Sequence, residues 1–207
     1  MKFLPEVLAF RNRLNALGIS VKDEDLKLFL PIVCRKEIQK GEIFLNEGEI
    51  CKETYFIVKG VVRSFQKLPN GSERTYVIGT KNHFFSEHTS FVSQTPSSDY
   101  LEAIEDTSVL YFTHNDLMEL YDKSHAIERI GRQLSDAKFI MAKTRLISVM
   151  NDDATTKYLH FIKNHEGLSH RIPQNIIASF LGITPQSFSR LKKEFENNNS
   201  KSESQNT

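Results

Sequence analysis

The feature that most limits the fold of this chain is a break between two short, apolar-patterned segments near its C-terminus. Residues 176–191 read IIASFLGITPQSFSRL. Gly182 lies where the chain must turn sharply, and a residue without Cβ adopts positive φ easily. Thr184 can cap a following helix through its hydroxyl, and Pro185 suits the first turn, where its missing N–H is not needed. Apolar residues flank the break at Ile177, Leu181, Ile183, Phe188 and Leu191. The segment therefore predicts a helix-turn-helix.

The second of these helices is predicted to carry polar side chains on its outer face. Gln and Arg can pair bidentately with base edges in the major groove of DNA, whereas Lys and Arg beside them suit phosphates. Residues 155–196 hold 6 Lys and Arg against 3 Asp and Glu, so this segment is basic although the whole chain has a net charge of only +1. The predicted DNA-binding residues are Arg171, Thr184, Gln186, Ser187, Ser189, Arg190, Lys192 and Lys193. The alternative, a helical hairpin with a plain solvated face, is disfavoured because turn, cap and apolar positions agree.

Composition excludes several other classes of protein. The chain has 207 residues, 39% hydrophobic and 26% charged, as is ordinary for a soluble globular protein of one or two domains. No apolar run approaches the roughly 18 residues of a membrane span, and charged residues interrupt the N-terminus, so we expect a cytoplasmic protein without membrane contact. Cys34 and Cys51 match no metal or redox spacing, and the seven histidines show no paired metal spacing. We therefore expect neither a metal nor another cofactor.

The region from about residue 32 to 112 is rich in short β-type runs separated by turn residues. Asn70-Gly71 is a strong hairpin signal, because both residues tolerate positive φ. So much antiparallel β-structure in about 80 residues favours a compact barrel or roll. Two helices are expected before it, over residues 3–17 and 20–30.

A long helical stretch is expected from about Asn115 to Met150, with a break near Lys123-Ser124. The 3-4-3-4 spacing of one apolar stripe predicts a coiled-coil seam with a second copy of the chain. That predicted dimer interface comprises Ile127, Ile130, Leu134, Ala137 and Met141. A second stripe is expected to pack on the chain's own domains, and it comprises Phe139, Ile140, Leu146 and Ile147. The alternative is an ordinary core helix without self-association.

The order of these parts resembles the Crp/Fnr family of bacterial transcription regulators. Residues 40–65, KGEIFLNEGEICKETYFIVKGVVRSF, resemble the β-roll signature of the family, with Gly41, Gly48 and Gly60 at turns. The helix-turn-helix at residues 174–193 is the second match. The resemblance implies a homodimeric transcription regulator whose partners are double-stranded DNA, a second copy of itself and RNA polymerase.

The fold class that follows is α+β, with an N-terminal antiparallel β-roll of the cyclic-nucleotide-binding type, a long dimerisation helix and a C-terminal winged helix-turn-helix. We expect the β-roll domain over residues 1–122, the dimerisation helix over 123–150 and the DNA-binding domain over 151–196, after a polar hinge. The low-complexity tail, 197–207, is expected to be disordered.

The ligand cassette departs from the family pattern. The cyclic-nucleotide binders of the family carry a Gly-Glu pair and then an Arg-Ser or Arg-Thr pair. Here Glu87 is present, but Ser86 replaces the Gly, and Ser97 and Ser98 stand where Arg-Ser would be. Residues 82–122 contain no Arg or Lys, and a buried phosphate without a cation is costly to desolvate. We therefore predict that cAMP does not control this protein, and that its pocket either is vacant or holds a different, less anionic small molecule.

Other functions find less support. Two distant cysteines cannot hold an iron–sulfur cluster, and His83, His88 and His114 fit polar surface residues better than haem ligands. An enzyme is disfavoured because the chain lacks a Gly-rich phosphate loop, a nucleophile elbow and an H-E-x-x-H motif, and nothing requires Glu87, His88 and Glu102 to form an acid–base set. The remaining alternative is a ligand-sensing adaptor with a β-roll pocket and no DNA role. Its mark would be a degraded helix-turn-helix, and this one is intact.

Overall fold

The computed structural model describes residues 4–165 and 167–204. The chain divides into two compact units, of which unit 1 comprises Met1–Gln66 and Tyr76–Ala142 and unit 2 comprises Lys67–Thr75 and Lys143–Thr207.

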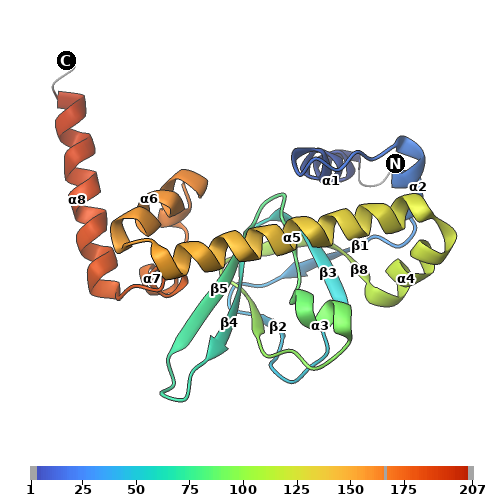
Figure 1. The fold of residues 1–207 in the computed structure, drawn as a ribbon, viewed down its shortest axis with the longest axis horizontal. Coiled ribbons are helices and arrows are strands. Elements are labelled where there is room, and N and C mark those ends of the chain that lie inside the picture. The colour runs from blue at the N-terminus through green and yellow to red at the C-terminus, as the bar shows by residue number, and fades with distance from the viewer. Residues whose placement is uncertain (1–3, 166, 205–207) are drawn as a thin grey trace. The chain divides into compact units, whose positions relative to one another are not determined.

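The first part of the chain contains two helices followed by a β-rich region (Figure 1). Its elements are α1 (Leu4–Ala16), α2 (Asp23–Phe29), β1 (Cys34–Ile38), β2 (Ile43–Leu45), β3 (Glu53–Lys59), β4 (Val61–Lys67), β5 (Glu73–Thr80), β6 (Phe84–Phe85), α3 (His88–Ser93), β7 (Tyr100–Ala103) and β8 (Thr107–Thr113). The elements that follow are helical, namely α4 (His114–Lys123), α5 (His125–Asn151), α6 (Ala154–Asn164), the 3-10 helix η1 (Leu168–His170), α7 (Gln174–Leu181) and α8 (Pro185–Ser204).

The strands form two four-stranded antiparallel sheets, in the orders β1-β8-β3-β6 and β2-β7-β4-β5. Phe56, Ile57 and Leu101 are among the largest fully buried side chains, so the core of unit 1 lies on the inner faces of the strands. The turn predicted at Asn70-Gly71 connects β4 and β5, where the Gly71 amide donates to the Leu68 carbonyl at 2.8 Å. The predicted antiparallel β-roll is confirmed.

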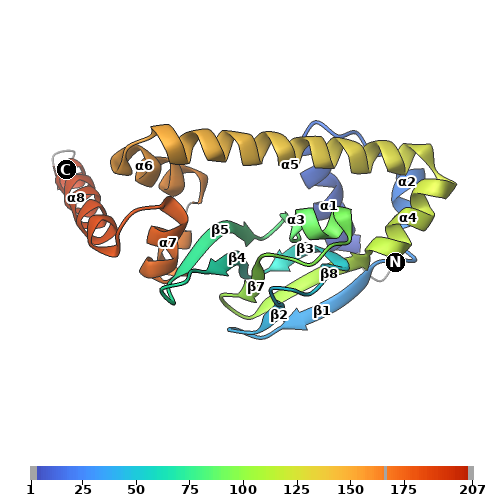
Figure 2. The same ribbon diagram turned by 60° about the horizontal axis from the view of Figure 1, so that its bottom comes forward.

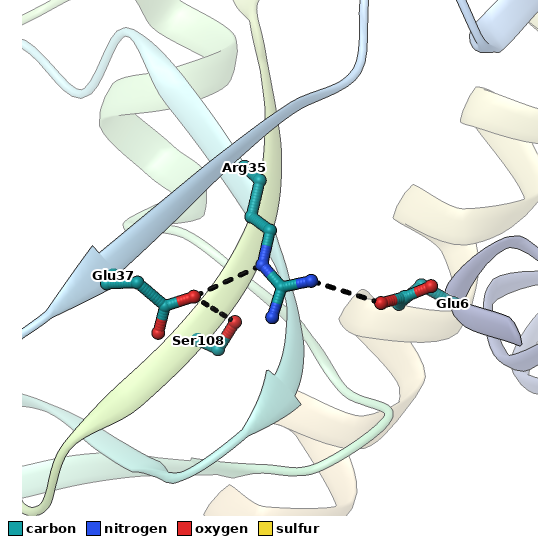
Figure 3. A network of polar contacts seen from close by, with 4 residues as sticks. All are labelled: Glu6, Arg35, Glu37 and Ser108. Carbon is teal, nitrogen blue, oxygen red and sulfur yellow. Dashed lines mark hydrogen bonds and ion pairs between the residues drawn. The ribbon is translucent and has the colours of Figure 1, made fainter. Parts of the chain in front are cut away.

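Helix α1 is joined to the β-roll by aromatic and polar contacts. The ring of Phe10 lies 5.5 Å from that of Phe56. Figure 3 shows the polar part, in which the Arg35 guanidinium donates to Glu6 at 3.2 Å and to Glu37 at 3.1 Å. The Ser108 hydroxyl also donates to Glu37, at 2.8 Å. This hydrogen bond, followed by that of Arg35, lowers the pKa of the Glu37 carboxyl below its ordinary value.

The long helical stretch is broken where it was predicted. Helix α4 ends at Lys123, and α5 then continues as one helix of 27 residues (Figure 2). The elbow between them is close-packed at Gly131, since a Cβ there would lie 1.8 Å from the Tyr121 hydroxyl oxygen. A side chain at this position of α5 would therefore force the Tyr121 ring to move.

The two apolar stripes of α5 face the opposite way from the prediction. Ile127 and Ile130 are buried in the core of unit 1, and Leu134 packs against that core, so placing them in a seam with a second copy is wrong. Ala137 is half-buried, and Met141 is exposed. The stripe expected to pack on the chain itself is exposed instead, at Phe139, Ile140, Leu146 and Ile147. The physical reason is that spacing identifies a stripe but does not say which surface the stripe faces.

Unit 2 is held by a helical core. Tyr158, Phe161, Ile177 and Phe188 are buried, and the rings of Tyr158 and Phe188 lie 5.6 Å apart. Asp153, in the predicted polar hinge, caps α6 by accepting a hydrogen bond from the Thr156 amide at 2.7 Å.

Two features of unit 2 differ from the sequence predictions. The described residues after Thr113 contain no strand, so the wing that the resemblance implies has no counterpart among them. Helix α8 runs to Ser204, so residues 197–204 continue the helix rather than forming a disordered tail. The remainder of that predicted tail, 205–207, lies outside the described residues.

Candidate nucleic-acid interface and effector pocket

The turn of the helix-turn-helix is fixed by its own hydrogen bonds. Gly182 ends α7 in the left-handed conformation, with φ of 68°. Its amide donates to the Ser179 carbonyl, and the Ile183 amide donates to the Ala178 carbonyl at 3.0 Å, a pattern that terminates helices at glycine. The Thr184 hydroxyl accepts from the Ser187 amide at 3.1 Å and so caps α8. The predicted turn and cap are both present.

The apolar face of α8 fixes which of its side chains point outward. Phe188 and Leu191 are buried in unit 2, as are Ile177 and Leu181 of α7. The opposite face of α8 forms an open hollow lined by Pro185, Gln186, Ser189, Arg190 and Lys193. Four of the predicted DNA-binding residues are therefore brought together on one surface.

The other four predicted DNA-binding residues lie elsewhere. Thr184 and Ser187 are bonded to each other in the cap, with 2.9 Å between their hydroxyl oxygens. Lys192 is half-buried, and Arg171 follows η1, ahead of α7. On the outer face, Arg190 makes a long contact of 3.9 Å with Glu194, and both side chains are well exposed.

Helix α7 is also attached to the last turns of α5. The Arg145 guanidinium lies over the Phe180 ring, 4.0 Å from its centroid, and donates to the Phe180 carbonyl. Burial lowers the pKa of Arg145 below its ordinary value, but arginine remains charged throughout the physiological range. The contact ties the C-terminal part of α5 to the helix-turn-helix within unit 2.

In the β-roll, Glu87 has a structural role. It is the N-cap of α3, and its carboxylate accepts hydrogen bonds from the amides of Thr89, at 3.2 Å, and Ser90, at 2.6 Å. The predicted ligand carboxylate is thus already engaged by the backbone of its own chain.

Ser97 and Ser98 both hydrogen-bond to Asp99, Ser97 through the backbone of Asp99 and Ser98 through its carboxylate. The Ser97 hydroxyl accepts from the Asp99 amide at 3.0 Å and donates to the Asp99 carbonyl at 2.8 Å. Ser98 donates to the Asp99 carboxylate at 3.1 Å, as do Gln66 at 2.9 Å and Ser64. An acid therefore occupies the neighbourhood in which the family pattern places a cation.

A cation reaches the other side of the cassette from α5. The ammonium of Lys138 lies 3.3 Å from the Ser86 hydroxyl, to which it donates, and 3.4 Å from Nδ1 of His88. Burial lowers the pKa of Lys138 to about 8. Burial and then the charge of Lys138 lower the pKa of His88 to about 4, so His88 is neutral at pH 7. Residues 82–122 contain no Arg or Lys, and this cation comes instead from a distant part of the sequence.

The remaining histidines and acids do not assemble into a site. His83 lies in a turn with Thr80, 3.1 Å from its hydroxyl, and the His114 ring packs 5.4 Å from that of Phe91. Glu102 is paired with Arg63 at 2.6 Å. Among the residues that the structure describes, no group of three or more His, Cys, Asp and Glu side chains could hold a metal ion.

With this geometry in view, comparisons with known proteins are consistent along most of the chain. The family model described as the cyclic nucleotide-binding domain matches residues 35–124. The fumarate and nitrate reduction regulatory protein of Yersinia pestis is 23% identical over 181 residues, which cover 80% of this chain and 70% of that protein.

Solved structures show the same fold. FixK2 from Bradyrhizobium japonicum is 18% identical, with a TM-score of 0.71 over 81% of this chain and 86% of that one. A Crp/Fnr protein from Eubacterium rectale is 15% identical, with a TM-score of 0.66 over 86% of this chain and 85% of that one. Residues 35–124 therefore match the cyclic nucleotide-binding domain, and the chain has the fold of Crp/Fnr proteins. The relatives from Yersinia pestis and Eubacterium rectale are described as regulators. No helix in the described part of this chain is long and apolar enough to cross a membrane.

Two residues close to the predicted ligand cassette, Asp99 and Lys138, were not identified from the sequence. Asp99 follows Ser98 directly and could have been noticed as an acid at the cassette. Lys138 lies four residues after Leu134 and three before Met141, on the side of α5 that faces the β-roll. A lysine within an apolar stripe is the signal that would have found it.

Proposed function

We propose that this chain is a sequence-specific DNA-binding transcription regulator that acts as a homodimer and is not controlled by cAMP. The observation that carries the proposal is the outer face of α8, where Gln186, Ser189, Arg190 and Lys193 share one open surface of an intact helix-turn-helix. We keep the expected division into a β-roll over 1–122, a dimerisation helix over 123–150 and a DNA-binding domain over 151–196. RNA polymerase, a partner implied by the family resemblance, belongs to the same proposal.

The face of α8 suits a major groove. Gln186 and Arg190 are four residues apart, so both lie on the same side of the helix near its N-terminus, which is the end that contacts bases in helix-turn-helix proteins. Their side chains can pair bidentately with adenine and guanine, whereas Lys193 suits a phosphate. Breaking the ion pair between Arg190 and Glu194 costs little free energy, because an exposed ion pair contributes less than about 1 kcal/mol to stability.

The homodimer is supported by the exposed stripe of α5. At about 100° per residue, Phe139, Ile140, Leu146, Ile147 and Met150 fall within roughly one third of the helix circumference, and each is half or more exposed. Lys143 lies on the same face, where its long stem allows the ammonium to reach water. Pairing two copies of this face would bury the stripe and present two α8 helices to half-sites roughly 34 Å apart.

Independence from cAMP rests on Asp99. The Asp99 carboxylate accepts hydrogen bonds from Gln66 and Ser98, and a carboxylate repels a cyclic phosphate where the family uses Arg. Calorimetry with cAMP and cGMP near pH 7.5 should show no micromolar binding. Binding of one molecule per subunit with tighter DNA association would contradict the proposal.

The test of DNA binding is capture of sheared genomic DNA from the host on immobilised full-length protein, followed by sequencing. We expect enrichment of fragments that contain two related half-sites about 10 base pairs apart, centre to centre. Enrichment no greater than on the bare support, or without a shared motif, would refute sequence-specific binding and favour the alternative of a ligand-sensing adaptor without a DNA role.

The test of the dimer is sedimentation of Leu146→Lys at micromolar concentration. A lysine pressed against its mate should cost several kcal/mol, so the variant should be monomeric. Arg132→Ala, on the polar N-terminal part of α5, is the matched control and should remain dimeric. A dimeric Leu146→Lys would exclude this face as the interface.

A further inference from the structure

The side chain of Lys138 is half-buried, and its ammonium lies against the β-roll without a counter-ion. Its two neighbours are the Ser86 hydroxyl at 3.3 Å and the His88 ring nitrogen at 3.4 Å, both neutral and both long for hydrogen bonds to an ammonium. No carboxylate forms an ion pair with it among the residues that the structure describes. One of its three N–H groups has no acceptor there either.

Another buried cation of unit 1 shows the usual arrangement. Arg63 is 5% exposed and pairs with Glu102 at 2.6 Å. Lys138 could have had a similar partner, because Glu87 is adjacent to both residues that it contacts. The Glu87 carboxylate, however, is held by the amides of Thr89 and Ser90. A buried charge whose nearest acid is engaged elsewhere is expensive unless a ligand supplies the counter-charge.

The remaining titratable groups around Lys138 are neutral at pH 7. Burial raises the pKa of the Cys51 thiol to about 11, and its sulfur donates to the Glu53 carbonyl at 3.3 Å. An ammonium has no lone pair, so Nδ1 of His88 must accept from Lys138 and the ring proton must be on Nε2. The site therefore offers one full positive charge, an imidazole N–H and a serine hydroxyl.

We propose that Lys138, together with Ser86 and His88, forms the anion-binding site of the β-roll, and that its ligand is a small organic carboxylate with a single negative charge. This inference rests on the proposed function in taking the β-roll as the effector domain. A single charge is favoured because only one cation is available, and a dianion would leave a buried charge unbalanced. Cyclic-nucleotide binders of the family place an Arg at the position of Ser97 and Ser98. A carboxylate held by Lys138 does not need that second cation, and Asp99 lies beside these serines instead.

Such a ligand would act on the helix that carries the exposed stripe. Lys138 directly precedes Phe139 and Ile140 in α5. An anion bound between Lys138 and the β-roll residues Ser86 and His88 would hold this part of α5 against the roll. The bound state would thereby orient the apolar face proposed for dimerisation.

The experiment is a pH titration of the full chain labelled with ¹³C at the lysine side chains, followed by NMR. The probes are acetate and benzoate as monocarboxylates, with inorganic phosphate and cAMP as comparisons. Lys138→Met assigns the signal, and Lys138→Gln replaces that variant if it fails to fold. Lys81→Met, which removes an exposed lysine of unit 1, is the matched control.

We expect saturating benzoate to raise the titration midpoint of Lys138 by about one pH unit or more, because a bound anion favours the ammonium. Benzoate affinity should fall about tenfold for each pH unit above the midpoint, and Lys138→Met should bind at least about tenfold more weakly. Lys81→Met should behave as the wild type in every respect.

A Lys138 midpoint that neither monocarboxylate moves at up to 100-fold excess over the protein would overturn the proposal, as would equal binding by Lys138→Met. A shift produced by cAMP or phosphate alone would overturn the ligand class. These outcomes are separate from those of DNA capture, which is performed without added ligand and reports on α8, so either proposal can fail while the other stands.

Discussion

The outer face of α8 and the site beside α3 both offer cations to an anionic partner, but they do so in opposite environments. The side chain of Arg190 is 71% exposed and shares its surface with Lys193. Lys138 of α5 is half-buried against the β-roll, beside the Ser86 hydroxyl and the His88 imidazole. Water and salt screen the charges on α8, so each adds a modest and salt-dependent contribution. A buried ammonium is screened little, and its protonation therefore depends on whether an anion is present.

The largest expected effect is that of Lys138→Met on stability. Since burial lowers the native pKa from 10.5 to about 8, the native state disfavours the ammonium, and at pH 7 the variant should be more stable by up to about 3 kcal/mol. Between pH 8 and 10.5 the unfolded state binds more protons, so the wild type gains stability and the difference should shrink. Urea denaturation at pH 7 and pH 10 measures this.

The matched control for that prediction is Lys81→Met, whose free energy of unfolding should stay near that of the wild type at both pH values. If Lys138→Met were instead less stable than the wild type at pH 7, interactions within the protein would outweigh the cost of burying the ammonium. The contrast between the two groups of cations would then disappear.

The next effect concerns base reading. Arg190→Ala should cost about 1–3 kcal/mol on the preferred site and much less on random DNA, because bidentate contacts to a base edge carry the discrimination. Fluorescence anisotropy with both DNAs at one fixed salt concentration measures the difference. Equal losses on the two DNAs would assign Arg190 to the phosphates.

The smallest effect is that of Lys193→Ala. Removing one phosphate contact should weaken specific and random binding alike, and the slope of log affinity against log salt should become shallower by about 1. The same anisotropy measurement over a series of salt concentrations gives the slope. An unchanged slope would mean that Lys193 does not touch the backbone of the DNA.

Local signals predicted the fold well. Gly182, Thr184 and Pro185 specify the helix-turn-helix through rules that involve only neighbouring residues, and Asn70-Gly71 does the same for its hairpin. The resemblance placed the β-roll, the long helix and the helix-turn-helix in their correct order. What it could not supply is the environment of individual side chains in this particular chain.

The errors share a cause, which is distance along the sequence. Whether Ile127 faces a core or a second copy depends on what packs against α5, and its spacing alone does not contain that information. Lys138 meets Ser86 across 52 residues, so a search confined to residues 82–122 could not find it. The role of Asp99 could not be predicted for another reason. The sequence shows an acid next to two serines, but not that Ser64 and Gln66 donate hydrogen bonds to its carboxylate.

The packing at Gly131 fixes one end of α5, so a small tilt there produces a larger displacement at the other end. Its first two turns are anchored by Ile127, by Ile130 and by the fit of Tyr121 against Gly131, while its last turns hold α7 through Arg145. A helix of 27 residues is about 40 Å long, so a tilt of about 5° at the elbow moves its far end by roughly 3 Å. That displacement is close to the roughly 3.4 Å between successive base pairs of DNA. If α8 reads DNA as proposed, a tilt too small to disturb the packing of Tyr121 against Gly131 would still move the last turns of α5 by about one base step.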